Sequence, residues 1–183
     1  MSYTIASDIH THTLYTRHAY STLAENVAAA RAAGLEVLGS ADHFSCMIYR
    51  AMICATTSLP QSIHLAAHVG RVTLLRGAEA DIVGLHGELF GQDVDANLTI
   101  VGYPYRDEKT LFERVTEGLD YVVASVHDSS FTRDASLAQT TEMYLGALEH
   151  PKVLVLGHTG RSGVPFDMER CSCVPRSSAS SSS

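Results

Sequence analysis

Histidines are the residues of this chain whose number and spacing most clearly suggest chemistry. The chain has ten of them, and three, His10, His12 and His18, fall within nine consecutive positions. In an extended segment, residues two apart point to the same side, with their Cα atoms about 6.6 Å apart. Histidine is the commonest metal ligand in proteins, so His10 and His12 can converge on one ion. We therefore predict a metal site near the start of the chain.

Four further ligand-type residues each follow or end an apolar segment. These are His43 in LEVLGSADH, Glu79 in RVTLLRGAEADI, His127 in YVVASVHD and His158 in KVLVLGHTG. A carboxylate has two oxygens and a charge that offsets the charge of cations, so we expect Glu79 to bridge two ions. His127 and His158 would complete the second ion, and His18 and His43 would serve a third. Imidazole and carboxylate ligands suit zinc, manganese or iron.

The pattern of apolar residues indicates the elements that position these side chains. Strands are expected at 3–10, 35–43, 71–82, 121–128 and 152–160, helices at 20–35, 58–70, 107–120 and 136–151, and a hairpin or long loop at 84–104. Thr22 and Glu25 have the spacing of a capping box, and Gly34 can end that helix. This alternation favours parallel strands with helices outside, as an α/β sheet or barrel. In a barrel, the carboxyl ends of the strands meet on one face, where active sites lie.

The bulk composition narrows the classes of protein. The net charge of −7 argues against nucleic-acid binding, which needs a basic surface. A run of about twenty apolar residues is absent from the sequence, so no membrane span is expected. The start, MSYTIASDIH, lacks the order of a secretory signal. The four cysteines (Cys46, Cys54, Cys171 and Cys173) lack the spacing of a disulfide framework, so we expect reduced thiols and a cytoplasmic protein.

Six short motifs together resemble a known family. DIHTHT, HAYST, ADH, RGAEADI, SVHD and LGHTGR are similar, in this order, to the motifs of the PHP (polymerase and histidinol phosphatase) superfamily, and most similar to its stand-alone phosphatase-type members. The resemblance implies a distorted seven-stranded β/α barrel of the TIM-like kind, with a trinuclear metal centre that hydrolyses phosphoesters. Here we expect an incomplete barrel of about five strand–helix units over residues 1–170.

The resemblance also implies roles for individual residues. His10, His12 and Glu79 would hold the first metal, Glu79, His127 and His158 the second, and His18 and His43 would contribute to the third. The implied reaction is hydrolysis of phosphate monoesters by a metal-activated hydroxide, and Glu79 and His127 would be its catalytic residues. The expected ions are zinc or manganese, with iron as an alternative, up to three in the family and fewer here.

The sequence departs from the family pattern after His158. The family supplies a further Asp-x-His on its last strand, but only 25 residues follow His158, and a strand–helix–strand unit takes about 30. Residues 171–183 hold seven serines and are expected to be disordered. We hypothesise a truncated or frame-shifted chain with alien sequence from near Cys171. In such a chain the first and third metals would each lose a ligand, so the second should bind best. Its open barrel edges would favour marginal stability or association into oligomers.

Three arginines follow ligand strands and are candidates for binding substrate phosphate: Arg17, Arg133 and Arg161. Asp42 and Asp128 adjoin ligand histidines and either orient them or face solvent. The leading hypothesis is a metal-dependent phosphatase acting on a small phosphorylated substrate. The alternatives are an inactive remnant that binds metal without turnover, and a nuclease or proofreading domain, against which the acidic charge argues.

Overall fold

The computed structural model describes residues 4–16, 18–45, 67–100 and 103–173. In chain order, the elements are β1 (Ser7–Thr11), α1 (Leu23–Ala33), β2 (Val37–Phe44), β3 (His68–Val69), β4 (Val72–Asp81), β5 (Asp95–Ile100), β6 (Tyr103–Thr110), α3 (Leu111–Thr116), β7 (Tyr121–Ser125), a 3₁₀ helix (Ser130–Thr132), α4 (Leu137–Glu149), β8 (Val153–Leu156), α5 (Thr159–Ser162) and α6 (Met168–Ser172). Strands and helices alternate at both ends of this order, as the sequence predicts, whereas β2 to β6 follow one another with no helix between them in the described residues.

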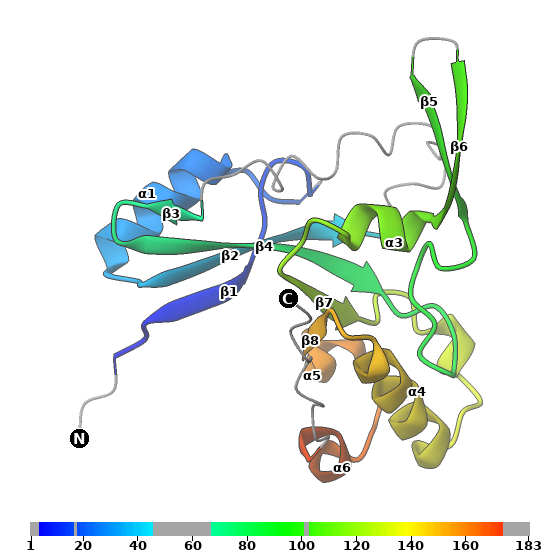
Figure 1. The fold of residues 1–183 in the computed structure, drawn as a ribbon. Coiled ribbons are helices and arrows are strands. Elements are labelled where there is room, and N and C mark those ends of the chain that lie inside the picture. Colours follow the sequence, from blue (N-terminus) through cyan, green and yellow to red (C-terminus); the bar gives the residue numbers. More distant parts are fainter. Residues whose placement is uncertain (1–3, 17, 46–66, 101–102, 174–183) are drawn as a thin grey trace, which may run out of the picture.

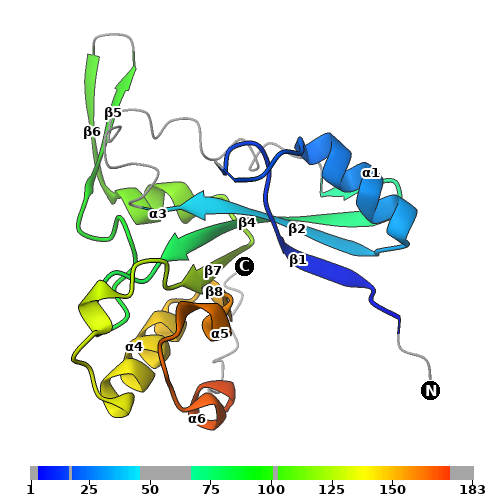
Figure 2. The same cartoon turned by 180° about the vertical axis from the view of Figure 1, so that it is seen from behind.

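The main sheet is parallel and curls into a half-barrel (Figures 1 and 2). Its strand order is β1-β2-β4-β7-β8, with the short β3 antiparallel to β4, and β5 and β6 form a separate hairpin. The expected fold, an incomplete β/α barrel, is confirmed. Within the described residues, β1 and β8 each pair with one strand only. Association of chains through these edges stays a prediction, which a measurement of mass in solution checks.

Local signals in the sequence fix the ends of the helices. Thr22 and Glu25 form the expected capping box at the start of α1, and Gly34 ends this helix in the left-handed conformation with φ 76°. Ser136 and Gln139 form the same reciprocal pair at the start of α4. Because these caps use the free N–H groups of the first turn, both helices begin close to where the sequence places them.

Two helices expected from the sequence differ in the structure. Helix 58–70 lies mostly outside the described residues, and its described end, His68–Val69, is strand β3, which turns through Gly70 and pairs with β4. Helix 107–120 begins later, because β6 runs to Thr110 and this residue then caps α3. The hairpin predicted for 84–104 therefore exists as β5–β6 and extends further along the chain.

The end of the described chain also differs from expectation. Helix α6 includes Cys171, which is buried against the main core, so the folded domain continues through Ser172 rather than ending at residue 170. The thiols of Cys171 and Cys173 are free, whereas Cys46, Cys54 and the serine-rich residues after 173 lie outside the described part. Among the described helices, none has the length and apolar character needed to cross a membrane.

The two faces of the sheet have different roles. Helices α3 and α4 pack on one face, where Phe44, Phe112 and Tyr144 are fully buried, and α1 covers the same face nearer the start of β2 and β4. The opposite face carries a small cluster that includes Tyr121 and Val123. Side chains alternate between faces along each strand. This opposite, concave face continues into the candidate site at the carboxyl ends of the strands.

Candidate metal centre

The register of three central strands brings polar side chains together on the concave face. His43 of β2 lies opposite Glu79 of β4, and Asp81 of β4 lies opposite Ser125 of β7. Residues two apart share a face, so Glu79 and Asp81 point to the same side as His43 and Ser125. All four residues are buried. The sheet therefore builds a rigid, buried floor of polar groups.

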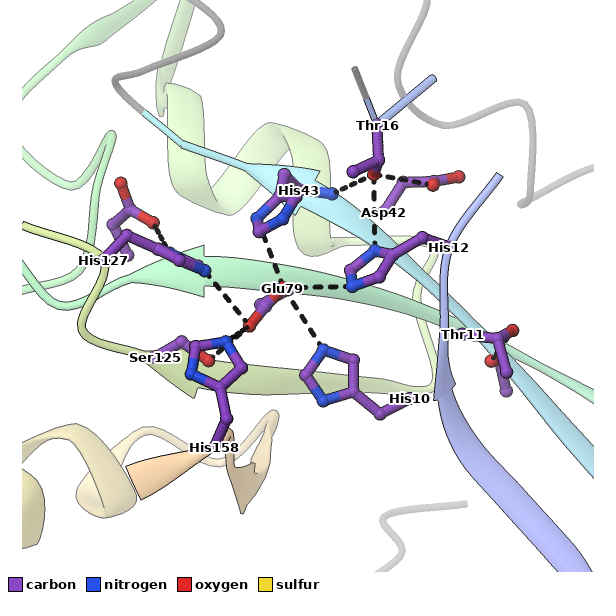
Figure 3. Close-up of polar contacts among 12 residues, drawn as sticks. His10, Thr11, His12, Thr16, Asp42, His43, Glu79, Ser125, His127 and His158 are labelled. Atoms are coloured by element: carbon purple, nitrogen blue, oxygen red, sulfur yellow. Dashed lines mark hydrogen bonds and ion pairs between the residues drawn. The ribbon is translucent and has the colours of Figure 1, made fainter. Parts of the chain in front are cut away.

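The other histidines reach this floor from the ends of neighbouring strands. His10 lies in β1, His12 directly after it, His127 shortly after β7 and His158 just before α5, while His18 comes from the segment between β1 and α1. Figure 3 shows His10 and His12 turned towards Glu79 with Thr11 pointing away, as the alternation of an extended strand requires. All seven residues predicted as metal ligands line one cleft of about 860 Å³.

Glu79 lies at the centre of this cluster, and its two oxygens face different histidines (Figure 3). Oε2 lies 3.2 Å from His10 Nε2, 3.4 Å from His12 Nε2 and 3.2 Å from His43 Nδ1. Oε1 lies 2.7 Å from His158 Nε2 and 3.4 Å from His127 Nε2. Because the side chain of Glu79 is 0% exposed, both oxygens are shielded from bulk water. The carboxylate thus separates the cluster into two halves.

Several polar atoms of the cluster are buried without a hydrogen-bond partner. Among the described residues, His10 Nε2, His43 Nδ1, His158 Nδ1 and Glu79 Oε2 have no hydrogen-bond partner. Leaving a buried polar atom unsatisfied is costly, and nitrogen and carboxylate oxygen are the atoms that bind divalent cations. Three groups have ligand atoms within 4.8 Å of one another: His10, His12 and Glu79; His43, Glu79 and His127; and His12, His18 and His43. The residues therefore fit divalent metal ions.

The protonation states of Glu79 and His43 suit metal ligands, whereas the carboxylates beside His127 favour its protonated form, so an ion bound there would displace a proton. Burial raises the pKa of Glu79, but contacts with His10, His127 and Ser125 outweigh it and lower that pKa below its usual range, so the carboxylate is ionised. Burial lowers the pKa of His43 to about 4, which leaves its imidazole neutral at pH 7. Burial also lowers the pKa of His127, but hydrogen bonds to Asp81 and Glu79 outweigh it and raise the pKa to about 9.

Residues that the sequence analysis did not single out hold the cluster in place. Asp81 Oδ1 lies 2.6 Å from His127 Nδ1, and the Ser125 hydroxyl donates to Glu79 Oε1 at 2.5 Å. Thr16 is fully buried and contacts His12 Nδ1 at 3.3 Å. The alternation rule could have found two of them, because Asp81 lies two residues after Glu79, and Ser125 two before His127.

Of the aspartates and arginines that the sequence suggests, some take part in the site or line the cleft and others do not. Asp42 takes part in the site through Thr16, whereas Asp128 accepts a hydrogen bond from the Ser130 backbone N–H. Arg161, on α5, lines the cleft. Arg133 is exposed and is not among the residues that line the cleft, and Arg17 lies outside the described residues.

His158 has a strained backbone. Its φ of 24° is the one positive value among the described non-glycine residues. Such conformations cost roughly 1–3 kcal/mol and persist only where the surrounding structure enforces them. Here the strain accompanies the direct approach of His158 Nε2 to Glu79.

Comparison with known proteins agrees with this geometry. The model of the PHP domain matches residues 8–163. A protein of Clostridium acetobutylicum named "Probable phosphatase" is 33% identical over 165 residues, which cover 88% of this chain and 57% of that protein. A protein of Aliivibrio fischeri with the same designation is 32% identical over 169 residues, covering 91% of this chain and 57% of its own length. The chain thus spans little more than half the length of these relatives.

Proposed function

Because the chain belongs to the PHP domain family, we propose that it is a divalent-metal-dependent phosphatase that hydrolyses small phosphate monoesters. The observation that carries the proposal is the buried Glu79 carboxylate, whose two oxygens face separate sets of histidines at the carboxyl end of the sheet. The names of the similar proteins support the same class of reaction. A water-accessible cleft of about 860 Å³ is large enough for a small organic phosphate.

We assign the ligands from these contacts. His10 and His12 would hold one ion with Glu79 Oε2, and His127 and His158 a second with Oε1. His18 and His43 would contribute to a third position, next to His12. Zinc and manganese, with iron as the alternative, match these donors. Divalent ions bound here would lower the pKa of water towards about 7 and offset negative charge on the phosphoryl group.

The chain's own contribution is to bind and orient the substrate. Arg161 lines the cleft, and no side chain in the described part of the chain pairs with its guanidinium. A guanidinium can donate two parallel hydrogen bonds to phosphate oxygens. Arg161 would therefore hold the phosphate against the floor of histidines, while ionised Glu79 stays fixed by Ser125.

Removal of metal is the direct test of the proposed function. After dialysis against a chelator, the chain should not hydrolyse p-nitrophenyl phosphate, and addition of Mn²⁺ or Zn²⁺ should restore hydrolysis. Metal content per chain, measured by elemental analysis on the same samples, should rise in parallel with turnover. Hydrolysis that survives complete removal of metal would contradict the proposal.

A second function, metal binding without turnover, is favoured by one observation. Glu79 is the one carboxylate among the described residues that line the cleft. The third position, at His12, His18 and His43, would then have no anionic ligand. One or two ions per chain, with no hydrolysis of any phosphate monoester tested, would support this alternative.

The role of Arg161 gives a second prediction. Arg161→Ala should raise the KM for p-nitrophenyl phosphate about tenfold or more, because a hydrogen bond to a charged group contributes roughly 1.5–3 kcal/mol. The metal content should not change, since Arg161 contacts the proposed ligand His158 through its backbone N–H, at 2.8 Å from the His158 carbonyl, and alanine keeps that bond. Arg133→Ala, at an exposed arginine away from the cleft, is the matched control. An unchanged KM in Arg161→Ala would remove Arg161 from the substrate site.

A further inference from the structure

Two carboxylates behind the histidine cluster point to a role that the ligand set does not include. We propose that Asp81, directly, and Asp42, through Thr16, are positioning residues that keep the Nδ1 proton on His127 and on His12. Each imidazole then presents its Nε2 lone pair to an ion. This inference rests on the proposed function, because it concerns the same metal centre.

The contact of Asp81 with His127 is short and buried. Asp81 is 3% exposed, and its Oδ1 lies 2.6 Å from His127 Nδ1. Its other oxygen, Oδ2, accepts a hydrogen bond from the Ser45 hydroxyl at 2.6 Å. An ionised carboxylate can only accept hydrogen bonds, so Nδ1 must be the donor. The nitrogen of His127 that an ion would take is then Nε2, which faces Glu79 Oε1 at 3.4 Å.

The hydrogen bonds of Thr16 lead to the same state for His12. Asp42 Oδ1 accepts from Thr16 Oγ1 at 2.9 Å, and this bond uses the one hydroxyl hydrogen of Thr16. Thr16 Oγ1 also accepts from the backbone N–H of His43 at 3.2 Å. Because the hydroxyl has no second hydrogen, it can only accept in its contact with His12 Nδ1 at 3.3 Å. The proton must therefore lie on Nδ1.

Asp42 is itself held in a fixed orientation. Its Oδ1 accepts from the backbone N–H of Thr13 at 2.6 Å, and its Oδ2 from the Thr13 hydroxyl at 2.7 Å. The carboxylate therefore cannot turn its oxygens away from Thr16 without losing two further hydrogen bonds. This arrangement fixes the Thr16 hydroxyl, and through it the ring of His12.

The two positioning groups act on opposite sides of Glu79. His12 Nε2 faces Oε2, and His127 Nε2 faces Oε1. Asp81 and Thr16 contact different imidazoles, so each can be changed while the other serves as the control. Loss of an outer partner of a ligating histidine typically weakens metal binding by 10- to 100-fold. Both groups should therefore affect affinity for metal, at different ions.

The test uses Zn²⁺ binding to the metal-free full chain, measured by calorimetry, and ¹⁵N NMR of the imidazoles in the Zn²⁺-loaded chain. Asp81→Ala should weaken the binding of one ion by about 10- to 100-fold, whereas Asp81→Asn, which keeps an acceptor oxygen, should lose less. Thr16→Val should weaken the binding of another ion, whereas Thr16→Ser, which keeps the hydroxyl, should bind that ion as the wild type does. In the NMR spectra, Asp81→Ala should alter the protonation pattern of His127 only, and Thr16→Val that of His12 only.

Several outcomes would overturn the inference. It is wrong if His127 or His12 in the Zn²⁺-loaded wild type lacks a proton on Nδ1, or if Zn²⁺ affinity in Asp81→Ala and Thr16→Val stays within twofold of wild type. If Asp81→Ala does not fold, the Asp81→Asn variant and the wild-type spectrum decide. None of these measurements needs turnover. A chain that shows the expected affinities but hydrolyses nothing would refute the proposed phosphatase and leave this inference standing.

Discussion

Glu79→Gln should lower phosphatase activity by about 10³-fold, which is the upper end of the range for loss of one electrostatic group from an active site. Glutamine has nearly the same shape, so it keeps an acceptor for the Ser125 hydroxyl that now donates to Glu79. It lacks the negative charge, however, and one of its two terminal atoms becomes an NH₂ group that donates hydrogen bonds. An NH₂ group cannot ligate a cation.

The position of Glu79 explains why the effect should be so large. Each carboxylate oxygen lies within 3.4 Å of nitrogens from a different set of histidines, so whichever oxygen is replaced, one half of the cluster loses its anionic ligand. The remaining half keeps its oxygen but loses the charge that offsets that of the cation. Metal content per chain should therefore fall together with the activity.

The control is Glu36→Gln, which changes an exposed carboxylate at the opposite end of β2. It should keep both wild-type activity and wild-type metal content. Thermal melting of both variants separates loss of function from loss of fold. A folded Glu79→Gln protein with unchanged turnover and metal content would mean that Glu79 does not bridge ions, and the proposed function would lose its main support.

Much of the site could be predicted because the relevant rules are local. His10 and His12 share a face through the two-residue repeat of a strand, and the caps at Thr22 and Gly34 place α1 within a few residues of its expected bounds. Parallel strands that end together then bring His43, the first of the distant histidines, beside Glu79. Each step needs only the type of element and its end, which short-range patterns indicate.

The features that sequence reasoning missed depend on contacts between distant segments. Asp81 shares a face with Glu79, but its partner His127 lies far along the chain. Thr16 gains its role from hydrogen bonds with the distant Asp42 and the backbone N–H of His43. Strand pairing also overrides the local preference for helix at 107–110. The sequence predicts a helix there, but the segment is the end of β6, because Thr110 pairs with Asp95 of β5. Pairing partners decide such short segments, and a single sequence does not show them.

The small size of residue 157 should also matter for activity, because this residue lies beside the Glu79 carboxylate. Gly157 follows β8 and donates a backbone hydrogen bond to Ala124 at 2.8 Å, which holds it against β7. A Cβ atom at this position would lie 2.0 Å from Ser125 Oγ, 2.9 Å from Val123 Cγ1 and 3.3 Å from Glu79 Oε1. The methyl group of Gly157→Ala would therefore displace the hydroxyl that orients the Glu79 carboxylate.

Gly157→Ala should lower the free energy of unfolding by about 1–3 kcal/mol, the usual cost of overpacking a core, and reduce activity by at least about tenfold, because the ligands are then displaced. Gly160→Ala is the matched control, since a Cβ there meets no atom within 4 Å. Adding Ser125→Ala to Gly157→Ala removes the atom that clashes most closely, so the double variant should regain stability without regaining activity. The two substitutions are in contact, and their effects should not add. If Gly157→Ala melts like wild type and turns over substrate within twofold of it, the close approach of β8 to the Glu79 carboxylate is not what holds the metal ligands in place.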